Sequence, residues 1–239
     1  MLKTLRATSA RFLETLATAT KTLVTVKDTV EITGHGPHQA AVFLGQLAKR
    51  GLLTRLRRGL YAIVPFGKER EFGNVFVVAN ALALPAPHFI SHWGALSFHN
   101  LLLQPSRTVH LSITRRRPAR EIGPTRFEFV LVPRRLLWGF RSEWVTGTDQ
   151  VPVSDLERTM IDGCWRPDLC GGMVELARAL WLGRDRLDWV RLLRYTRRFG
   201  KRVVAKRLGF VLEALKLGGD SILSGLRGCT GGGRPYSPL

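Results

Sequence analysis

The chain has 239 residues and a formal net charge of +19, from 37 Lys and Arg against 18 Asp and Glu. Hydrophobic residues make up 45% of the chain, which excludes a disordered polypeptide. No apolar run reaches the length of a membrane-spanning helix and none reads as a secretory signal, so we expect a cytoplasmic protein with no membrane contact. The cationic surplus favours a polyanionic partner, of which nucleic acid is the common one, although an acidic protein or ribosomal RNA would satisfy the same electrostatics.

The first 66 residues predict a winged helix-turn-helix. "TSARFLETLATA" predicts a helix, and "LVTVKDTVEITG" predicts a short extended piece and a short helix that Thr25 caps and Gly34 ends. "GPHQAAVFLGQLAKRG" predicts a third helix entered at Pro37. "LLTRLRRGLYAIVP" predicts a β-hairpin that turns at Gly59. A winged helix-turn-helix has this order of elements, although a small α+β module that binds protein has similar parts.

The third helix carries the candidate base-reading residues. Its apolar face consists of Ala40, Ala41, Leu44, Leu47 and Ala48, and the opposite face presents Gln39, Gln46 and Arg50. Glutamine pairs with adenine and arginine with guanine in the major groove. We therefore predict base contacts by Gln39, Phe43, Gln46 and Arg50, with Phe43 against a thymine methyl group. The predicted phosphate contacts are His38, Lys49, Arg55, Arg57 and Arg58.

A mixed α/β region follows a linker predicted at 67–73. Residues 74–84 predict an apolar helix, and "HFISHWGALSFHNLL" predicts another, with Ser91 as its cap. "RTVHLSITRRRPAR" and "TRFEFVLVPRRL" predict alternating strands joined by a basic loop, and "WGFRSEWVTGTDQVPVS" predicts further strand pieces. His92 and His99 would share a helix face. They are either a catalytic pair or hydrogen-bonded core residues, and the absence of a nearby carboxylate at ligand spacing favours the core.

"VSDLERTMID" could be a metal-dependent nuclease centre or the start of a helix. Ser154 and Glu157 have the spacing of a capping box, and Arg158 can pair with Asp155 or Asp162. A nuclease would use Asp155, Glu157 and Asp162, yet no lysine follows at the spacing of such centres. The helix start is favoured, so we expect no catalytic residue, no metal and no cofactor. Cys164, Cys170 and Cys229 are expected to be reduced apolar residues.

The rest of the chain predicts helices, one from residue 172 and two more that break near Gly200. "GGGRPYSPL" predicts a tail. The arginines of two segments are either solvated or form a second basic surface; they are Arg115, Arg116, Arg117, Arg191, Arg194 and Arg198. The predicted class is α+β, with a winged helix-turn-helix (1–66), a linker (67–73), a mixed α/β domain (74–225) and a Gly/Pro-rich tail (226–239).

Four segments together resemble the AbiEi-type antitoxins, predicted transcriptional regulators of phage-defence systems. They are "LAKRGLLTRLRRGLYAIVP", "FISHWGALSFHNLL", "VSDLERTMIDGCWRPDLCGG" and "VAKRLGFVLEALKLGG". The resemblance implies an N-terminal winged helix that represses its own operon and a C-terminal domain needed for antitoxicity. It also implies a nucleotidyltransferase-like toxin that is countered without a stable complex. Family members continue past the final Gly/Pro stretch, so the resemblance implies an incomplete C-terminal domain here.

The leading hypothesis is therefore a DNA-binding repressor and antitoxin that is not an enzyme. It would bind an operator with inverted repeats in double-stranded DNA, with cooperative self-association on the DNA as a further expectation. One alternative is the nuclease that uses the acidic cluster. The other is a non-catalytic protein that binds RNA or a partner through the basic helices between residues 191 and 207.

Overall fold

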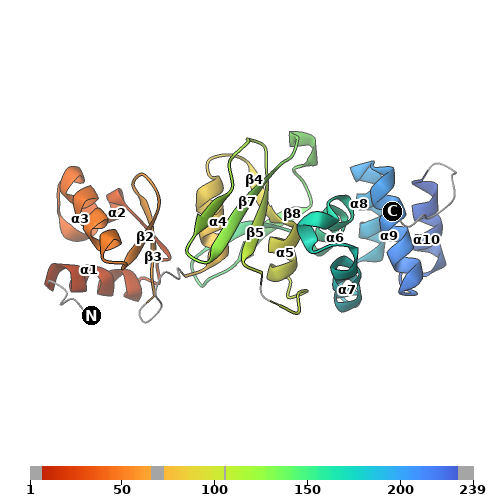
Figure 1. Ribbon diagram of the computed structural model, residues 1–239, viewed down its shortest axis with the longest axis horizontal. Coiled ribbons are helices and arrows are strands. Elements are labelled where there is room, and N and C mark those ends of the chain that lie inside the picture. The colour runs from red at the N-terminus through yellow and green to blue at the C-terminus, as the bar shows by residue number, and fades with distance from the viewer. Residues whose placement is uncertain (1–6, 66–72, 105, 231–239) are drawn as a thin grey trace.

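The computed structural model describes residues 7–65, 73–104 and 106–230. Three lobes follow one another along an elongated molecule: helices with a small sheet, then a larger sheet, then a group of helices (Figure 1). The mixed α/β class is confirmed, since the described chain forms two sheets together with helices in every lobe. No helix in these ranges is both long enough and apolar enough to cross a membrane.

The individual helices and strands predicted for the first lobe are present in the predicted order. Thr25 and Asp28 form a capping box, in which Thr25 Oγ1 accepts from the Asp28 N–H at 3.1 Å and Asp28 accepts from the Thr25 N–H at 2.8 Å. Gly34, with φ 71°, ends that helix in the left-handed conformation. The elements are α1 (Ala7–Thr18), β1 (Leu23–Thr25), α2 (Val26–Thr33), α3 (Pro37–Lys49), β2 (Leu53–Arg57) and β3 (Leu60–Ile63).

The three-stranded sheet, in the order β1-β3-β2, is covered on both faces. Successive side chains of a strand point to opposite faces. On β3, Tyr61 packs into the core of the first lobe with Phe12, whereas Leu60 and Ala62 belong to the core of the second lobe. The hairpin therefore joins two hydrophobic cores, which explains why its second strand is apolar at every position.

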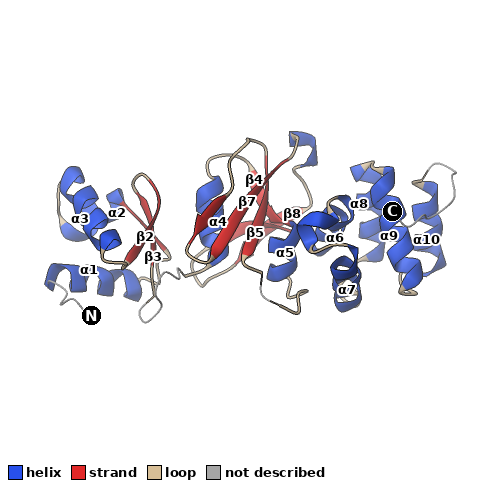
Figure 2. Ribbon diagram, in the orientation of Figure 1, coloured by secondary structure: helices blue, strands red, loops and turns tan. Residues whose placement is uncertain are grey.

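The second lobe is built on a mixed sheet, whose strands are red in Figure 2. The strand order is β6-β7-β5-β4-β9-β8. β5 pairs parallel with β7 and antiparallel with β4, and β4 pairs parallel with β9. The strands are β4 (His88–Ser91), β5 (Thr108–Ile113), β6 (Arg120–Ile122), β7 (Thr125–Leu131), β8 (Phe140–Trp144) and β9 (Gln150–Ser154), and the helical elements are α4 (Val75–Ala83), α5 (His92–Phe98) and η1 (Arg134–Leu136).

The prediction of one helix over "HFISHWGALSFHNLL" is wrong in its first part, because its first four residues form β4. All four are buried, since β4 lies inside the sheet with neighbours on both sides. A short apolar run of this kind has the same pattern in a buried strand and in a buried helix. The helix α5 begins directly after Ser91, as predicted, although the Ser91 side chain makes no capping hydrogen bond.

The third lobe is helical, and its core also includes Leu96 and Leu136 of the second lobe. That core includes Met160, Leu180, Leu192 and Leu212, so the domain predicted at 74–225 contains two separate hydrophobic clusters. Its elements are α6 (Leu156–Trp165), η2 (Pro167–Cys170), α7 (Met173–Gly183), α8 (Trp189–Phe199), α9 (Arg202–Ala214) and α10 (Gly219–Gly228).

The predicted tail begins too early, because α10 runs to Gly228. Its three glycines give it a weak helical signal, yet Gly225 lets it pack closely on α8. A Cβ at Gly225 would lie 2.5 Å from Leu193 Cδ2. Residues 231–239 of the predicted tail lie outside the described residues, as does the predicted linker except for Gly73.

Candidate nucleic-acid interface

The exposed face of α3 carries polar and small side chains. Ala40, Leu44 and Leu47 are buried against the first lobe. The solvent face consists of His38, Gln39, Ala41, Val42, Gln46 and Lys49. Gly45 lies in the same stretch, and a Cβ placed there would meet nothing within 4 Å. This face has the composition of a major-groove surface: amide groups, a cation and a position where a backbone can come close.

Two of the predicted base-reading residues lie on the flank of α3 that faces α1. The Phe43 ring packs edge-on against Phe12, with 5.2 Å between centroids, and against His35 at 5.7 Å. Arg50 is half-buried at the end of the helix. Both line a hollow together with Ser9 and Gln46. Val42, which is 47% exposed, is the apolar side chain that projects from the solvent face.

The hairpin presents its arginines to solvent. Arg55, Arg57 and Arg58 are all exposed, while Leu56 between them is fully buried. Successive side chains of a strand point to opposite faces, so Arg55 and Arg57 share the face opposite Leu56. Gly59, with φ 75°, closes the turn as predicted. The three cations therefore stand together at one end of the sheet, available to an anionic partner.

One arginine of the possible second basic surface contacts the protein itself. Arg117 donates hydrogen bonds to the carbonyls of Leu82 and Leu84, so its guanidinium holds the end of α4. Arg115 and Arg116 remain exposed. These three arginines belong to the segment 114–119, which we call the arginine loop.

On α8, two of the three predicted cations contact other side chains. Arg191 forms ion pairs with Glu157 at 3.6 Å and Asp188 at 3.5 Å. The Arg198 guanidinium lies 4.3 Å from the centre of the Trp138 ring. Arg194 is exposed. A neighbouring carboxylate or aromatic ring therefore already engages two of these three arginines.

The acidic cluster of "VSDLERTMID" starts a helix, but Asp155 caps it in place of the predicted Ser154. Asp155 Oδ1 accepts from the Arg158 N–H at 2.8 Å, and Oδ2 accepts from Tyr195. Ser154 ends β9, where its hydroxyl lies 3.2 Å from the Ile90 carbonyl and 2.8 Å from the Thr159 hydroxyl. The predicted Ser154–Glu157 capping box is wrong because Ser154 is the last residue of β9 and its hydroxyl bonds within the sheet and to Thr159.

The three carboxylates of the proposed nuclease centre have separate partners. Glu157 accepts from the Asp188 N–H at 2.8 Å. Asp162 forms a fully buried pair with Arg158 at 2.9 Å. Within the described ranges, no group of three or more His, Cys, Asp or Glu residues is placed to hold a metal ion. The three cysteines are free thiols, and burial raises the pKa of the Cys164 thiol to about 12.

The two histidines singled out in the sequence lie in different places. His99 Nε2 contacts the Ser154 carbonyl at 2.8 Å. His92 is fully buried, with Nδ1 2.9 Å from Ser91 Oγ and its ring 6.1 Å from that of His110. Each histidine has its own hydrogen bond, and they do not form a pair. His92 is the first residue of α5, and His110 lies on β5, on the same face of that strand as Ser112.

Burial holds the pKa of His92 well below its ordinary value of 6.5, with the positive charges of His110 and Arg158 adding to the effect. Below pH 6.5, His92 binds a proton in the unfolded chain but stays neutral in the folded chain. The contribution of His92 to the free energy of unfolding is therefore fully present above pH 6.5 and is lost as the pH falls below it. We expect His92 alone to lower the unfolding free energy by about 1.4 kcal/mol per pH unit below 6.5. Urea unfolding between pH 5 and 8 measures this slope.

The control for that slope is His92→Asn, because asparagine tolerates the φ of 51° at this position. The variant should show a flatter decline of stability with acid than the original chain. An unchanged slope would assign the acid sensitivity to other groups, such as His88, His99 or His110, whose pKa values burial also lowers.

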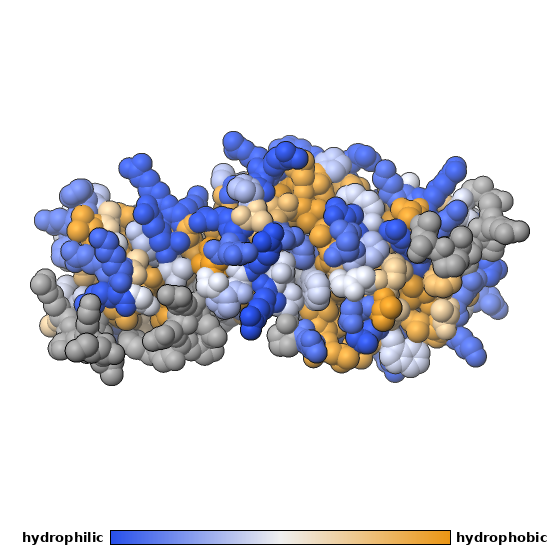
Figure 3. Space-filling view, in the orientation of Figure 1, coloured by the Kyte–Doolittle hydropathy of each residue, from blue (hydrophilic) through white to orange (hydrophobic). Residues whose placement is uncertain are grey.

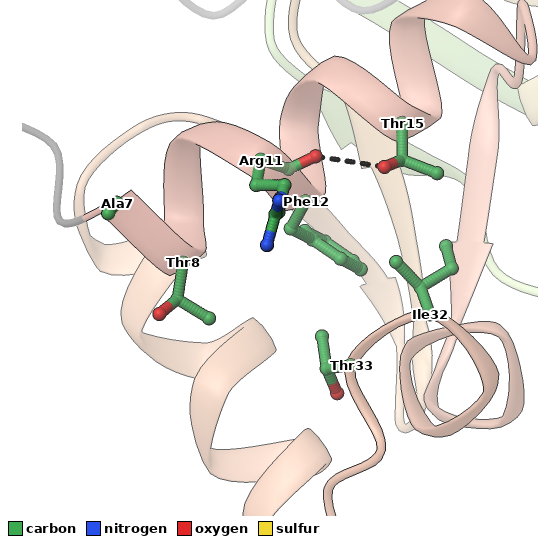
Figure 4. Close-up of a pocket in the computed structure, with 7 residues that line it drawn as sticks. All are labelled: Ala7, Thr8, Arg11, Phe12, Thr15, Ile32 and Thr33. Carbon is green, nitrogen blue, oxygen red and sulfur yellow. Dashed lines mark hydrogen bonds between the residues drawn. The ribbon is translucent and has the colours of Figure 1, made fainter.

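One open hollow lies between α1 and α2 (Figure 4). Arg11 points toward it, and Thr15 Oγ1 donates to the Arg11 carbonyl at 2.9 Å. Its other lining residues are Ala7, Thr8, Phe12, Ile32 and Thr33. None of these described lining residues is a carboxylate, a histidine or a cysteine.

The described chain thus combines a helix–hairpin lobe that carries exposed cations with a mixed α/β body. No family model matches the chain, and the search of curated proteins found no match. Among solved structures, it is similar to the crystal structure of the RV2827C protein from Mycobacterium tuberculosis. The TM-score is 0.68 at 17% identity, over 95% of this chain and 82% of the other. At that identity the likeness concerns the fold.

Proposed function

We propose that residues 7–63 form a winged helix-turn-helix and that the protein is a DNA-binding repressor. The observation that carries the proposal is the joint exposure of the polar face of α3 and the hairpin arginines. Gln39 and Gln46 are exposed on one, and Arg57 and Arg58 on the other. α3 would enter the major groove, while the hairpin would contact phosphates.

The element order supports this proposal. α2 and α3 are joined by three residues, Gly34 to Gly36, which is a connection typical of helix-turn-helix units. The strands after α3 form the hairpin, and β1 completes the sheet beside β3. In this arrangement Val42, rather than Phe43, is the side chain available to a thymine methyl group.

The sharpest test is a change in sequence preference at one base pair. We expect the protein to bind the DNA upstream of its own gene more tightly than a scrambled duplex of equal length. Gln46→Ala should cost about 1–3 kcal/mol of discrimination at the base pair that Gln46 reads. Competition binding against a set of single-base-pair variants of the promoter fragment measures this change.

The matched control is Gln104→Ala, which removes an exposed amide from the second lobe. It should leave the preference at every position unchanged. Equal binding of the original chain to promoter and scrambled DNA would reject the repressor proposal. An equal effect of the two alanine variants would show that Gln46 reads no base.

We further propose that the repressor is the antitoxin of an abortive-infection operon. Support comes from the resemblance of the four segments, of which the second and third lie side by side, since β4 pairs with β9 at Ile90 and Val153. The partner would be a nucleotidyltransferase-like toxin. Expression of such a protein from the adjacent reading frame should arrest growth, and co-expression of this chain should restore it. Arrest that persists would reject the antitoxin role and leave the DNA-binding test unaffected.

A further inference from the structure

The hairpin of the first lobe lies against the sheet of the second lobe. Leu56 and Leu60 belong to one hydrophobic cluster with Val78 of α4 and Ile122 of β6. Arg120 Nη1, at the start of β6, donates to the Leu56 carbonyl at 2.6 Å. The apolar contact and the hydrogen bond fix the hairpin beside the segment that precedes β6, which is the arginine loop.

The arginine loop and the hairpin bring their positive charges together. Partial burial lowers the pKa of the Arg117 guanidinium, and the nearby positive charges of Arg115 and Arg57 lower it further. Arg117 stays in place because it donates to the Leu82 and Leu84 carbonyls. Cations from two segments about sixty residues apart in the chain therefore form one surface. Figure 3 shows hydrophilic side chains gathered over this junction.

This shared surface has no acidic residue from its own segments. Residues 50–65 and 107–120 together contain nine arginines and no Asp or Glu: Arg50, Arg55, Arg57, Arg58, Arg107, Arg115, Arg116, Arg117 and Arg120. Arg115 and Arg116 are exposed, and within the described ranges neither has an ion pair. Like charges held close together repel, and an anionic ligand that lies across both segments relieves that repulsion.

We propose that Arg115 and Arg116 contact backbone phosphates of the same duplex that the first lobe binds. The inference rests on the proposed function and adds a second contact region, which extends the footprint beyond the reach of α3 and the hairpin. Duplex DNA suits such a surface because it carries one negative charge per about 1.7 Å of its axis. These contacts would be independent of base sequence.

The experiment compares two double variants of the full chain, each of which removes two exposed positive charges. One is Arg115→Gln with Arg116→Gln. The matched control is Arg194→Gln with Arg202→Gln, on α8 and α9 of the third lobe. Binding to the promoter fragment is measured between 50 and 200 mM salt, and hydroxyl-radical footprints are recorded for all three proteins.

Loss of two phosphate contacts should reduce the steepness of log K against log salt by about 1.8. It should also shorten the footprint at one end, while preference among base pairs stays unchanged. The control should keep the slope and the footprint of the original chain. If both double variants keep the salt dependence and the footprint of the original chain, this inference is overturned but the repressor proposal is not. Failure of the original chain to prefer the promoter would overturn the repressor proposal itself.

Discussion

Replacement of Arg158 by alanine is expected to lower the free energy of unfolding by about 3–5 kcal/mol. Arg158 is fully buried, and its Nε donates to Asp162 at 2.9 Å. Its guanidinium also lies 4.4 Å from the centre of the Trp138 ring. The alanine variant would leave the Asp162 carboxylate buried without its cation. Urea unfolding at pH 7.5 measures the loss.

The control for this prediction is the double variant Arg158→Met with Asp162→Leu, which replaces both charges by apolar groups of similar volume. Such replacements of a buried ion pair are often neutral, because no uncompensated charge remains. We expect the double variant to recover most of the stability that alanine loses. If the single and double variants are equally unstable, packing accounts for the effect and the ion pair does not.

The same arginine constrains the chain at Gly139. That glycine has φ 72°, and a Cβ there would lie 2.9 Å from Arg158 Cβ. The loop before β8 must therefore pass close over the α6 backbone, with no side chain between them. The buried guanidinium, the ring of Trp138 and this close approach together join the sheet lobe to the helical lobe.

Neutralisation of the hairpin is expected to have the largest effect on DNA binding. The phosphate contacts predicted for the first lobe, about five, should by themselves make the affinity of the original chain fall several hundredfold between 50 and 200 mM salt. The triple variant Arg55→Gln, Arg57→Gln and Arg58→Gln should keep about two of these, so the first-lobe contribution should give a fall of only about tenfold over that range. Binding isotherms on the promoter fragment at several salt concentrations measure both slopes.

A matched triple variant separates location from net charge. Arg134, Arg135 and Arg194 are exposed arginines outside the first lobe, and their replacement by glutamine removes the same total charge. The salt dependence of this control should match that of the original chain. If it becomes as shallow as that of the hairpin variant, the effect is one of overall charge and the hairpin has no special role.

The sequence predicts the first lobe well because its signals are local. Thr25, Gly34, Pro37 and Gly59 each act within a few residues, through a cap, a helix stop, a helix start and a turn. The exposure of Gln39 and Gln46 follows from helical periodicity alone. Periodicity does not determine which flank of α3 packs against α1. The packing of Phe43 against Phe12 therefore cannot be predicted from the sequence.

The second lobe is harder to predict because its features depend on distant partners. The strand β4 is recognised only from its neighbours β5 and β9, and the parallel pairing of β5 with β7 has no local signal. Ser154 loses its predicted capping role to a contact with Ile90, 64 residues away. The meeting of Arg57 with Arg117 is likewise a property of the folded chain.

The sheet of the first lobe has a consequence for protein engineering. Leu60 and Ala62 would be uncovered if residues 1–65 were grafted onto another body, and the cluster around Val78 would be uncovered if they were deleted. A chimera or a truncated chain would expose these apolar side chains to solvent and aggregate, whatever its affinity for DNA. Point substitutions of exposed residues are therefore the better way to separate the role of the first lobe from that of the other two lobes.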